Sequence, residues 1–174
     1  ERAEKRLASF RSRITLVHGN FSDIKIILKK ANLMNVGGLI LDLGVSSPQL
    51  DSPNRGFSFM RNGPLDMRMD SSQKITAADL LVELSDEKLV SIIKEYGEER
   101  FSKRIVRAIR QAQTKSSIKT TLQLSNIIST AVHASRQYKI HPATRTFQAL
   151  RIAVNGELEH IKKALVDSVD ILQE

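Results

Sequence analysis

Two short apolar runs and the amphipathic segment between them constrain the fold most strongly. The run ITLVHGNF (residues 14–21) reads as a strand that continues into a loop, and GGLILD (residues 37–42) has the apolar character of a buried strand up to its final aspartate. Residues 22–31 between them suit a helix, with Ser22 as its N-cap. The apolar positions of this segment recur at helical spacing: Ile24, Ile27, Leu28 and Ala31. A strand, a helix and a strand in this order predict a βαβ unit and therefore an α/β fold.

The second run ends on Asp42, and a long segment without helical periodicity follows it. Residues 42–70 read DLGVSSPQLDSPNRGFSFMRNGPLDMRMD, which is rich in Ser, Pro, Asn and Gly. Loops of this length in a compact domain are uncommon and usually functional. Ligands of open α/β sheets bind beyond the carboxyl ends of the strands, so we expect a ligand site here with Asp42 at its mouth. A helix cap or a turn is the alternative role for a single aspartate at this position.

Beyond residue 70 the pattern indicates helices only. The candidates are residues 76–83, 86–96 with Ser85 as N-cap, 99–113, 121–134 and one long helix from 143 to about 172. Residues 1–10 also read as the end of a helix. A single apolar stripe is expected on the helix over residues 99–113: Phe101, Ile105, Ala108 and Ala112. Gly156 lies in the middle of the long helix, where it costs about 1 kcal/mol relative to Ala, and the sequence gives no reason for it.

The positive charge is concentrated in one part of the chain. The net charge is +8, and residues 97–145 contain ten Lys or Arg against two acidic residues. A localised basic block is typical of proteins that bind a polyanion such as RNA, although a solvated helix face is the alternative. The candidate phosphate contacts are Arg100, Lys103, Arg104, Arg107, Arg110, Lys139 and Arg145.

Composition excludes several kinds of site. The chain has no cysteine, which excludes disulfides, thiolate zinc sites and a cysteine nucleophile. Its four histidines are scattered without metal-ligand spacing, so no metal site is predicted. The sequence contains no apolar run of the length that crosses a bilayer, and no membrane partner is expected.

Five blocks in one order carry a resemblance to a known family: DLGVSSPQLD, RGFSF, GPLDMRMD, YGEERFSKRI and HPATRTFQALRIAVN. Together they closely resemble the ribosomal RNA small subunit methyltransferase H family, over essentially the whole chain. The resemblance implies a Rossmann-like methyltransferase sheet with an inserted all-helical domain. It also implies a cytoplasmic enzyme that uses S-adenosylmethionine to methylate N4 of a cytidine in the decoding region of 16S rRNA.

The resemblance also divides the chain and indicates what it lacks. Residues 1–52 would belong to the methyltransferase domain, 53–142 to the loop and a helical substrate-recognition insertion, and 143–174 to a helix returning to the first domain. No GxG occurs among the eight glycines, and the family's glycine-rich cofactor loop and ribose-binding acid are expected upstream of Glu1. Further strands are expected beyond Glu174. We therefore expect the sheet to be incomplete, and this piece alone to be inactive and not to bind S-adenosylmethionine measurably.

Site residues follow from the matching positions. Phe21 is implied against the adenine of the cofactor, and Asp42 and Gln49 near its polar groups. Asp42, Ser46 and Ser47 are the groups available to orient the cytosine amine towards the methyl sulfonium. The family usually has Asp where this chain has Asn62, which suits a turn role better than substrate binding. The partner implied is small-subunit rRNA or a ribosomal particle, and a homodimer is left open.

Alternatives stay open at three points. Asp66 and Asp70 are candidates for a general acid/base pair, but a loop pinned through Arg68 is favoured. His141, before Pro142, suits a helix-entry turn better than a catalytic base. The competing function is a non-catalytic RNA-binding module that uses the basic helices alone, whereas a nucleotide-dependent oxidoreductase has no support beyond the βαβ pattern.

Overall fold

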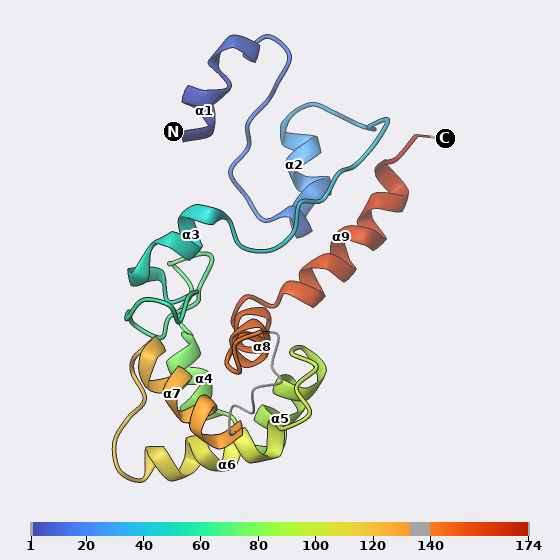
Figure 1. Ribbon diagram of the computed structural model, residues 1–174. Coiled ribbons are helices and arrows are strands. Elements are labelled where there is room, and N and C mark those ends of the chain that lie inside the picture. Colours follow the sequence, from blue (N-terminus) through green and yellow to red (C-terminus); the bar gives the residue numbers. More distant parts are fainter. Residues whose placement is uncertain (1, 133–139, 174) are drawn as a thin grey trace. The chain divides into compact units, whose positions relative to one another are not determined.

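The computed structural model describes residues 2–132 and 140–173. The chain divides into two compact units, one made of Glu1–Asp42 with Glu157–Glu174 and the other of Leu43–Gly156 (Figure 1). Within the described ranges, none of the helices is both long and apolar enough to traverse a membrane.

The first unit is built from short helices near the start of the chain and one 15-residue helix near its end. Its elements are α1 (Arg2–Arg6), η1 (Ala8–Phe10), η2 (Phe21–Asp23), α2 (Ile24–Lys30) and α9 (Glu157–Ile171). The helix predicted over residues 22–31 is confirmed as α2, but its N-cap position is Asp23 rather than Ser22. The Asn20 side chain caps the preceding turn η2, where it accepts a hydrogen bond from the Ser22 amide at 2.9 Å. Both η2 and α2 pack against α9.

Ion pairs join the elements of the first unit. Lys25 on α2 contacts Asp170 and, at 3.4 Å, Asp167 of α9. Lys163 on α9 contacts Asp23 at 3.2 Å. The hydrogen bonds to Asp170 and to Asp23, respectively, are the main cause that raises the pKa of each ammonium group. These contacts hold α9 against the turn that begins α2.

The two predicted strands do not form. Residues 14–20 and 37–42 are irregular, and the first unit has one isolated parallel bridge, between Val36 and Leu172. A strand is stable only when a neighbouring strand pairs with its backbone groups. No such neighbour lies beside either run in the described part of the chain, and the side chain of Ile40 is 94% exposed. The two strands predicted for these residues are therefore absent from the structure.

The second unit is helical. Its elements are α3 (Ser47–Asp51), η3 (Pro53–Arg55), α4 (Ala77–Glu83), α5 (Asp86–Glu95), α6 (Ser102–Gln113), α7 (Thr121–Val132) and α8 (Thr144–Asn155). The helices predicted over residues 76–83 and 86–96 are confirmed, as is Ser85 as the cap of α5, and the helix predicted over 121–134 is confirmed for its described residues up to Val132. Helix α6 begins at Ser102 instead of residue 99, because the buried Glu99 carboxylate accepts a hydrogen bond from the Phe101 amide at 2.8 Å.

An aliphatic core holds this unit together, with α6 packed on α7 and α5 on α8. Leu65 and Met67, from the long loop, belong to the same buried cluster as the helices. The stripe predicted on α6 is partly wrong: Ile105 is buried, but Val106 and Ile109 are its buried companions. Phe101, Ala108 and Ala112 are only half-buried, because α6 is rotated to face both α5 and α7.

The long helix predicted from residue 143 is two helices. Helix α8 ends at Asn155, and Gly156 adopts the left-handed conformation (φ 57°, ψ 32°) before α9 begins at Glu157. A residue without Cβ enters this region at little cost, and glycine is the usual residue there at helix ends. The glycine that the sequence left unexplained is therefore a helix stop.

Candidate functional site

The residues implied for cofactor binding and catalysis fall into both units. Phe21 and Asp42 belong to the first unit, whereas Ser46, Ser47 and Gln49 belong to the second. Asp42 is exposed at the end of the first unit. We predict that Asp42, Gln49 and Phe21 line one pocket. This stays a prediction, because the structure describes distances within each unit and Gln49 belongs to a different unit from Phe21 and Asp42.

The turn that carries Phe21 is held by α9. The half-buried Phe21 ring lies edge-on to the ring of His160, with centroids 6.3 Å apart and an interplanar angle of 87°. His160 Nδ1 also lies 3.2 Å from Asn20 Nδ2, and Lys163 donates a hydrogen bond to the Ser22 carbonyl. Sequence reasoning missed His160, because one histidine on an amphipathic helix has no recognisable spacing.

Ser46, Ser47 and Gln49 lie together at the start of α3. Gln49 Oε1 accepts hydrogen bonds from the Ser46 amide at 2.9 Å and from the Ser46 hydroxyl at 3.0 Å. This is a capping interaction of the kind that stabilises a first helical turn, with Pro48 inside it. The Gln49 oxygen is therefore engaged, and its Nε2 amide is the group left to donate to a ligand.

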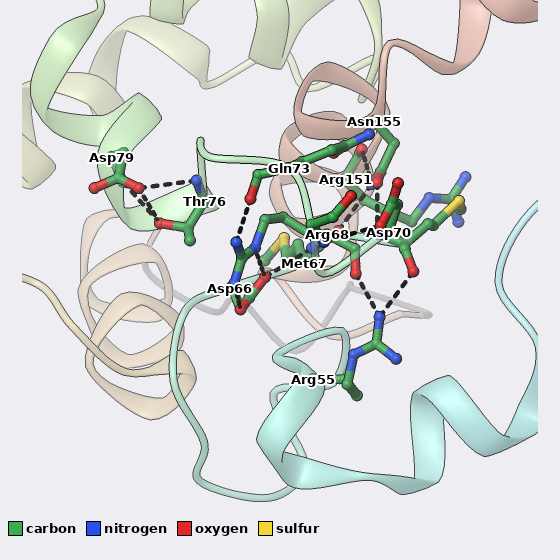
Figure 2. A network of polar contacts seen from close by, with 12 residues as sticks. Arg55, Asp66, Met67, Arg68, Asp70, Gln73, Thr76, Asp79, Arg151 and Asn155 are labelled. Atoms are coloured by element: carbon green, nitrogen blue, oxygen red, sulfur yellow. Dashed lines mark hydrogen bonds and ion pairs between the residues drawn. The ribbon is translucent and has the colours of Figure 1, made fainter.

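The segment Asp66–Arg68 is fixed by a two-point ion pair (Figure 2). Arg68 Nε lies 2.7 Å from Asp66 Oδ1, and Arg68 Nη2 lies 2.8 Å from Oδ2. Arg68 also donates to the Gln73 carbonyl. The hydrogen bonds from Arg68 lower the pKa of the Asp66 carboxyl, although partial burial opposes the shift. A carboxylate kept ionised in this way is a poor general acid, which supports the pinned-loop alternative over an Asp66–Asp70 pair.

Asn155 clamps the next residues of the loop. Its Nδ2 donates to the Met67 carbonyl at 2.8 Å, and its Oδ1 accepts from the Met69 amide at 2.6 Å (Figure 2). Between these bonds Met67 is fully buried with φ 63°, a conformation that non-glycine residues rarely adopt. Arg55 Nη2 adds bonds to the carbonyls of Arg68 and Met69 at 2.6 and 3.0 Å. Sequence reasoning missed both clamps, because nothing local marks an asparagine or arginine whose partners lie far along the chain.

The basic block forms an exposed surface on α6. Lys103, Arg104 and Arg107 are exposed, as is Arg100, whose guanidinium lies 4.6 Å from the centre of the Phe101 ring. A groove of about 390 Å³ runs along this surface between α5 and α6. Its lining residues are Asp86, Val90, Lys103, Val106, Arg107, Arg110, Gln111 and Thr114.

Arg110 differs from the other arginines of this surface. Its Nε lies 2.6 Å from Asp86 Oδ1, and its Nη2 donates to the Leu84 carbonyl at 2.5 Å. A further bond from Nη1 reaches the Leu81 carbonyl. Arg110 thus fixes α6 to the end of α4 and the start of α5, and a phosphate contact by it would compete with these bonds.

Two further predicted residues, His141 and Arg145, lie near the start of α8. Arg145 is exposed and donates from Nη1 to the Glu98 carbonyl at 3.0 Å, whereas Lys139 lies outside the described residues. His141 Nδ1 accepts a hydrogen bond from the Ala143 amide at 3.2 Å, which confirms the helix-entry role. In the ranges that the structure describes, no three His, Cys, Asp or Glu side chains gather as metal ligands would.

Comparison with known proteins identifies the family. The family model described as the MraW methylase family matches residues 1–174. The chain belongs to the MraW methylase family. It is 52% identical over 167 residues to the Ribosomal RNA small subunit methyltransferase H of Acinetobacter baumannii (strain ACICU), covering 96% of this chain and 53% of that protein. The protein of the same name from Brevibacillus brevis is 49% identical over 173 residues, with 99% and 55% covered.

Membership of the MraW methylase family bears on the fold. The chain spans about half the length of the curated relatives it matches. The family implies a Rossmann-like methyltransferase fold, which agrees with the α/β class predicted from residues 14–42. The described residues contribute helices and the Val36–Leu172 bridge to it. The assignment of residues 53–142 to an inserted substrate-recognition domain stays a prediction.

Proposed function

We propose that this MraW methylase family member acts in the S-adenosylmethionine-dependent methylation of N4 of a cytidine in the decoding region of 16S rRNA. The observation that carries the proposal is the family match over residues 1–174. The relatives' printed name, Ribosomal RNA small subunit methyltransferase H, supports methyl transfer to small-subunit rRNA. The N4 atom and the decoding region rest on the resemblance of the five sequence blocks.

The chemistry of the implied donor set fits S-adenosylmethionine. The half-buried Phe21 ring offers an apolar surface suited to adenine. Asp42 offers an exposed carboxylate that accepts hydrogen bonds from hydroxyl or ammonium groups. Gln49, whose oxygen is engaged by Ser46, would donate from Nε2 to an acceptor on the cofactor. When bound, the cofactor supplies an electrophilic methyl group on a positively charged sulfur.

The protein must compensate for a weak nucleophile. The lone pair of the cytosine amine is delocalised into the ring, so orientation of the amine towards the methyl group is the main requirement. Asp42 would accept a hydrogen bond from the amine and take the proton that the amine loses as the nitrogen–carbon bond to the methyl group forms and the carbon–sulfur bond breaks, which would leave a neutral thioether. Ser46 and Ser47 would position the same amine through their oxygens. These 174 residues contain no cysteine, so they offer no thiolate for a covalent route to carbon 5.

The exposed cations of α6 would hold the RNA backbone. The exposed side chains of Lys103, Arg104 and Arg107 take part in none of the ion pairs found among the described residues. Contacts to phosphate position an RNA without reading its sequence. A paired target base must also leave its helix before its amine can be reached.

Methyl transfer to small ribosomal subunits tests the proposal. The protein, expressed at the full length of its relatives, is incubated with labelled S-adenosylmethionine and subunits that lack the modification. Mass spectrometry of the nucleosides should then show N4-methylcytidine. The Asp42→Ala variant should lose transfer with unchanged circular dichroism, whereas Asp51→Ala, which removes another exposed carboxylate, should match the wild type.

The outcomes separate the candidate functions. Wild-type rates in both Asp42→Ala and Asp42→Asn would remove Asp42 from the active site. A full-length protein that binds the RNA but transfers no methyl group and binds no cofactor would support the non-catalytic RNA-binding module instead.

A further inference from the structure

Three aromatic rings of the second unit form a stack that runs from the core to the surface. Phe147 on α8 is buried, with only 4% of its surface exposed. The half-buried Phe59 lies edge-on to it, with centroids 5.0 Å apart and an interplanar angle of 74°. His141 stacks on Phe59 nearly in parallel, at 4.5 Å and 25°. His141 is exposed and is therefore the outermost ring of the three.

Local bonds fix the orientation of the His141 ring. Its Nδ1 accepts from the Ala143 amide at 3.2 Å, and its carbonyl accepts from the Thr144 amide at 3.0 Å, where α8 begins. The helix-entry role uses one ring nitrogen and the backbone, and it does not require an aromatic ring. A ring held in place before binding loses little conformational freedom when a ligand stacks on it.

The two chain segments that carry the stack, residues 57–63 and 140–147, are positively charged. Neither residues 57–63 nor residues 140–147 include an aspartate or glutamate. Arg61 and Arg145, one in each segment, are exposed. Each donates one hydrogen bond from Nη1, to the backbone carbonyls of Asp51 and Glu98 respectively, so their other guanidinium nitrogens remain for a ligand. Unpaired nucleobases stack on aromatic side chains, and their phosphates are attracted to neighbouring arginines. These features fit an unpaired nucleotide of RNA.

We propose that the outer face of His141 is a stacking platform for an unpaired base of the RNA substrate. The inference rests on the proposed function, because it takes RNA as the ligand. It adds a base-binding site on the helical unit that needs neither the cofactor nor Asp42. Phe59 supports the platform from beneath, and Phe147 anchors Phe59 to the core.

Two substitutions separate stacking from helix entry. His141→Asn keeps a side-chain oxygen that can accept from the Ala143 amide but removes the ring. His141→Phe keeps a ring but removes the acceptor. The full-length protein without cofactor is titrated into fluorescein-labelled hexacytidylate and into an abasic oligomer with the same number of phosphates, and Kd is read from fluorescence anisotropy.

The wild type should bind hexacytidylate more tightly than the abasic oligomer. His141→Asn should weaken hexacytidylate binding about fivefold or more, the lower range for loss of one base–aromatic stack, with unchanged binding of the abasic oligomer. His141→Phe should bind hexacytidylate within about twofold of the wild type, although its Tm should be the lower of the two variants because a cap is lost.

Equal affinity of the wild type for both probes would overturn the platform, as would unchanged hexacytidylate binding by His141→Asn. Equal losses on both probes would also overturn it, since they would indicate a general disturbance of the RNA surface. Methyl transfer is measured separately on small subunits. If no methyl group is transferred but the protein still binds hexacytidylate more tightly than the abasic oligomer, the proposed activity is rejected and the stacking platform is retained.

Discussion

Loss of the Asn155 side chain should destabilise the protein strongly. Asn155 is only 5% exposed, and it bonds the Met67 carbonyl at 2.8 Å and the Met69 amide at 2.6 Å. In Asn155→Ala both loop groups lose their partner. A buried polar group without a partner costs about 1–3 kcal/mol. The cost should be smaller for the amide of the half-buried Met69, which water can reach, than for the carbonyl of the buried Met67. We therefore expect the free energy of unfolding to fall by about 3 kcal/mol.

Urea denaturation followed by circular dichroism measures this change. For a chain of this size, about 3 kcal/mol corresponds to a Tm lower by about 6–12 °C. The matched control is Asn126→Ala, which removes an exposed asparagine of α7 and should change the free energy of unfolding by less than about 0.5 kcal/mol. If the two variants are destabilised equally, the clamp on the loop contributes nothing, and the argument from buried hydrogen bonds fails.

The Asn155→Asp variant tests the direction of the bonds. A carboxylate keeps the acceptor for the Met69 amide but places a negative oxygen against the Met67 carbonyl. Burial and this carbonyl should raise the pKa of the new carboxyl in the folded state. Its protonated form can donate to the carbonyl as the amide does. The deficit in stability relative to the wild type should therefore shrink as the pH falls through that pKa, and a deficit independent of pH would contradict this account.

Three further outcomes can be measured on the same protein. Arg110→Met should lower the free energy of unfolding by about 1–2 kcal/mol, since the partly buried Leu84 carbonyl loses its Arg110 donor, whereas the Leu81 carbonyl keeps the one from Gln113. Arg107→Met should leave stability within about 0.5 kcal/mol but reduce the salt slope of RNA binding by about one. Because the pKa of Asp66 is lowered in the folded state, its carboxylate stabilises the fold above the unfolded pKa of about 4, and this stabilisation is lost as the pH falls. In Asp66→Asn the urea midpoint should therefore depend less on pH between about pH 6 and pH 2 than in the wild type. Gly156→Ala should cost about 1 kcal/mol because φ at this position is 57°. Gly38→Ala should be neutral, because the added Cβ would meet no atom within 4 Å.

Local signals predicted the helices of the second unit well. Thr76 and Ser85 stand where side-chain oxygens cap α4 and α5, and the apolar spacing that follows each of them is helical. These signals depend on residues three or four apart, so the sequence contains them in full. The strands over residues 14–21 and 37–42 depend instead on neighbours elsewhere in the chain, and the described residues supply none. The break at Gly156 was not predicted, because a glycine inside an apolar repeat is compatible both with one continuous helix that tolerates it and with the end of a helix.

Charge in the sequence predicted the basic surface but not the roles within it. Arg107 and Arg110 are three positions apart on α6, and the sequence presents them as equivalent. In the structure Arg107 is exposed, whereas Arg110 binds Asp86 and two carbonyls. What distinguishes them is the rotation of α6 relative to α4 and α5, which depends on packing of the whole unit. The same dependence explains why Asn155 was missed, because its partners lie more than eighty residues away.

The long loop after residue 42 has two parts of different physical character. Residues 64–70 are fixed by burial of Leu65 and Met67, by the Asp66–Arg68 ion pair and by Asn155. Residues 43–48 are mostly exposed, and only the short helix α3 orders the serines there. Binding residues commonly lie on exposed segments that a rigid scaffold positions. The fixed part of the loop is therefore best understood as the support, and the exposed serines with Gln49 as the part available to a ligand.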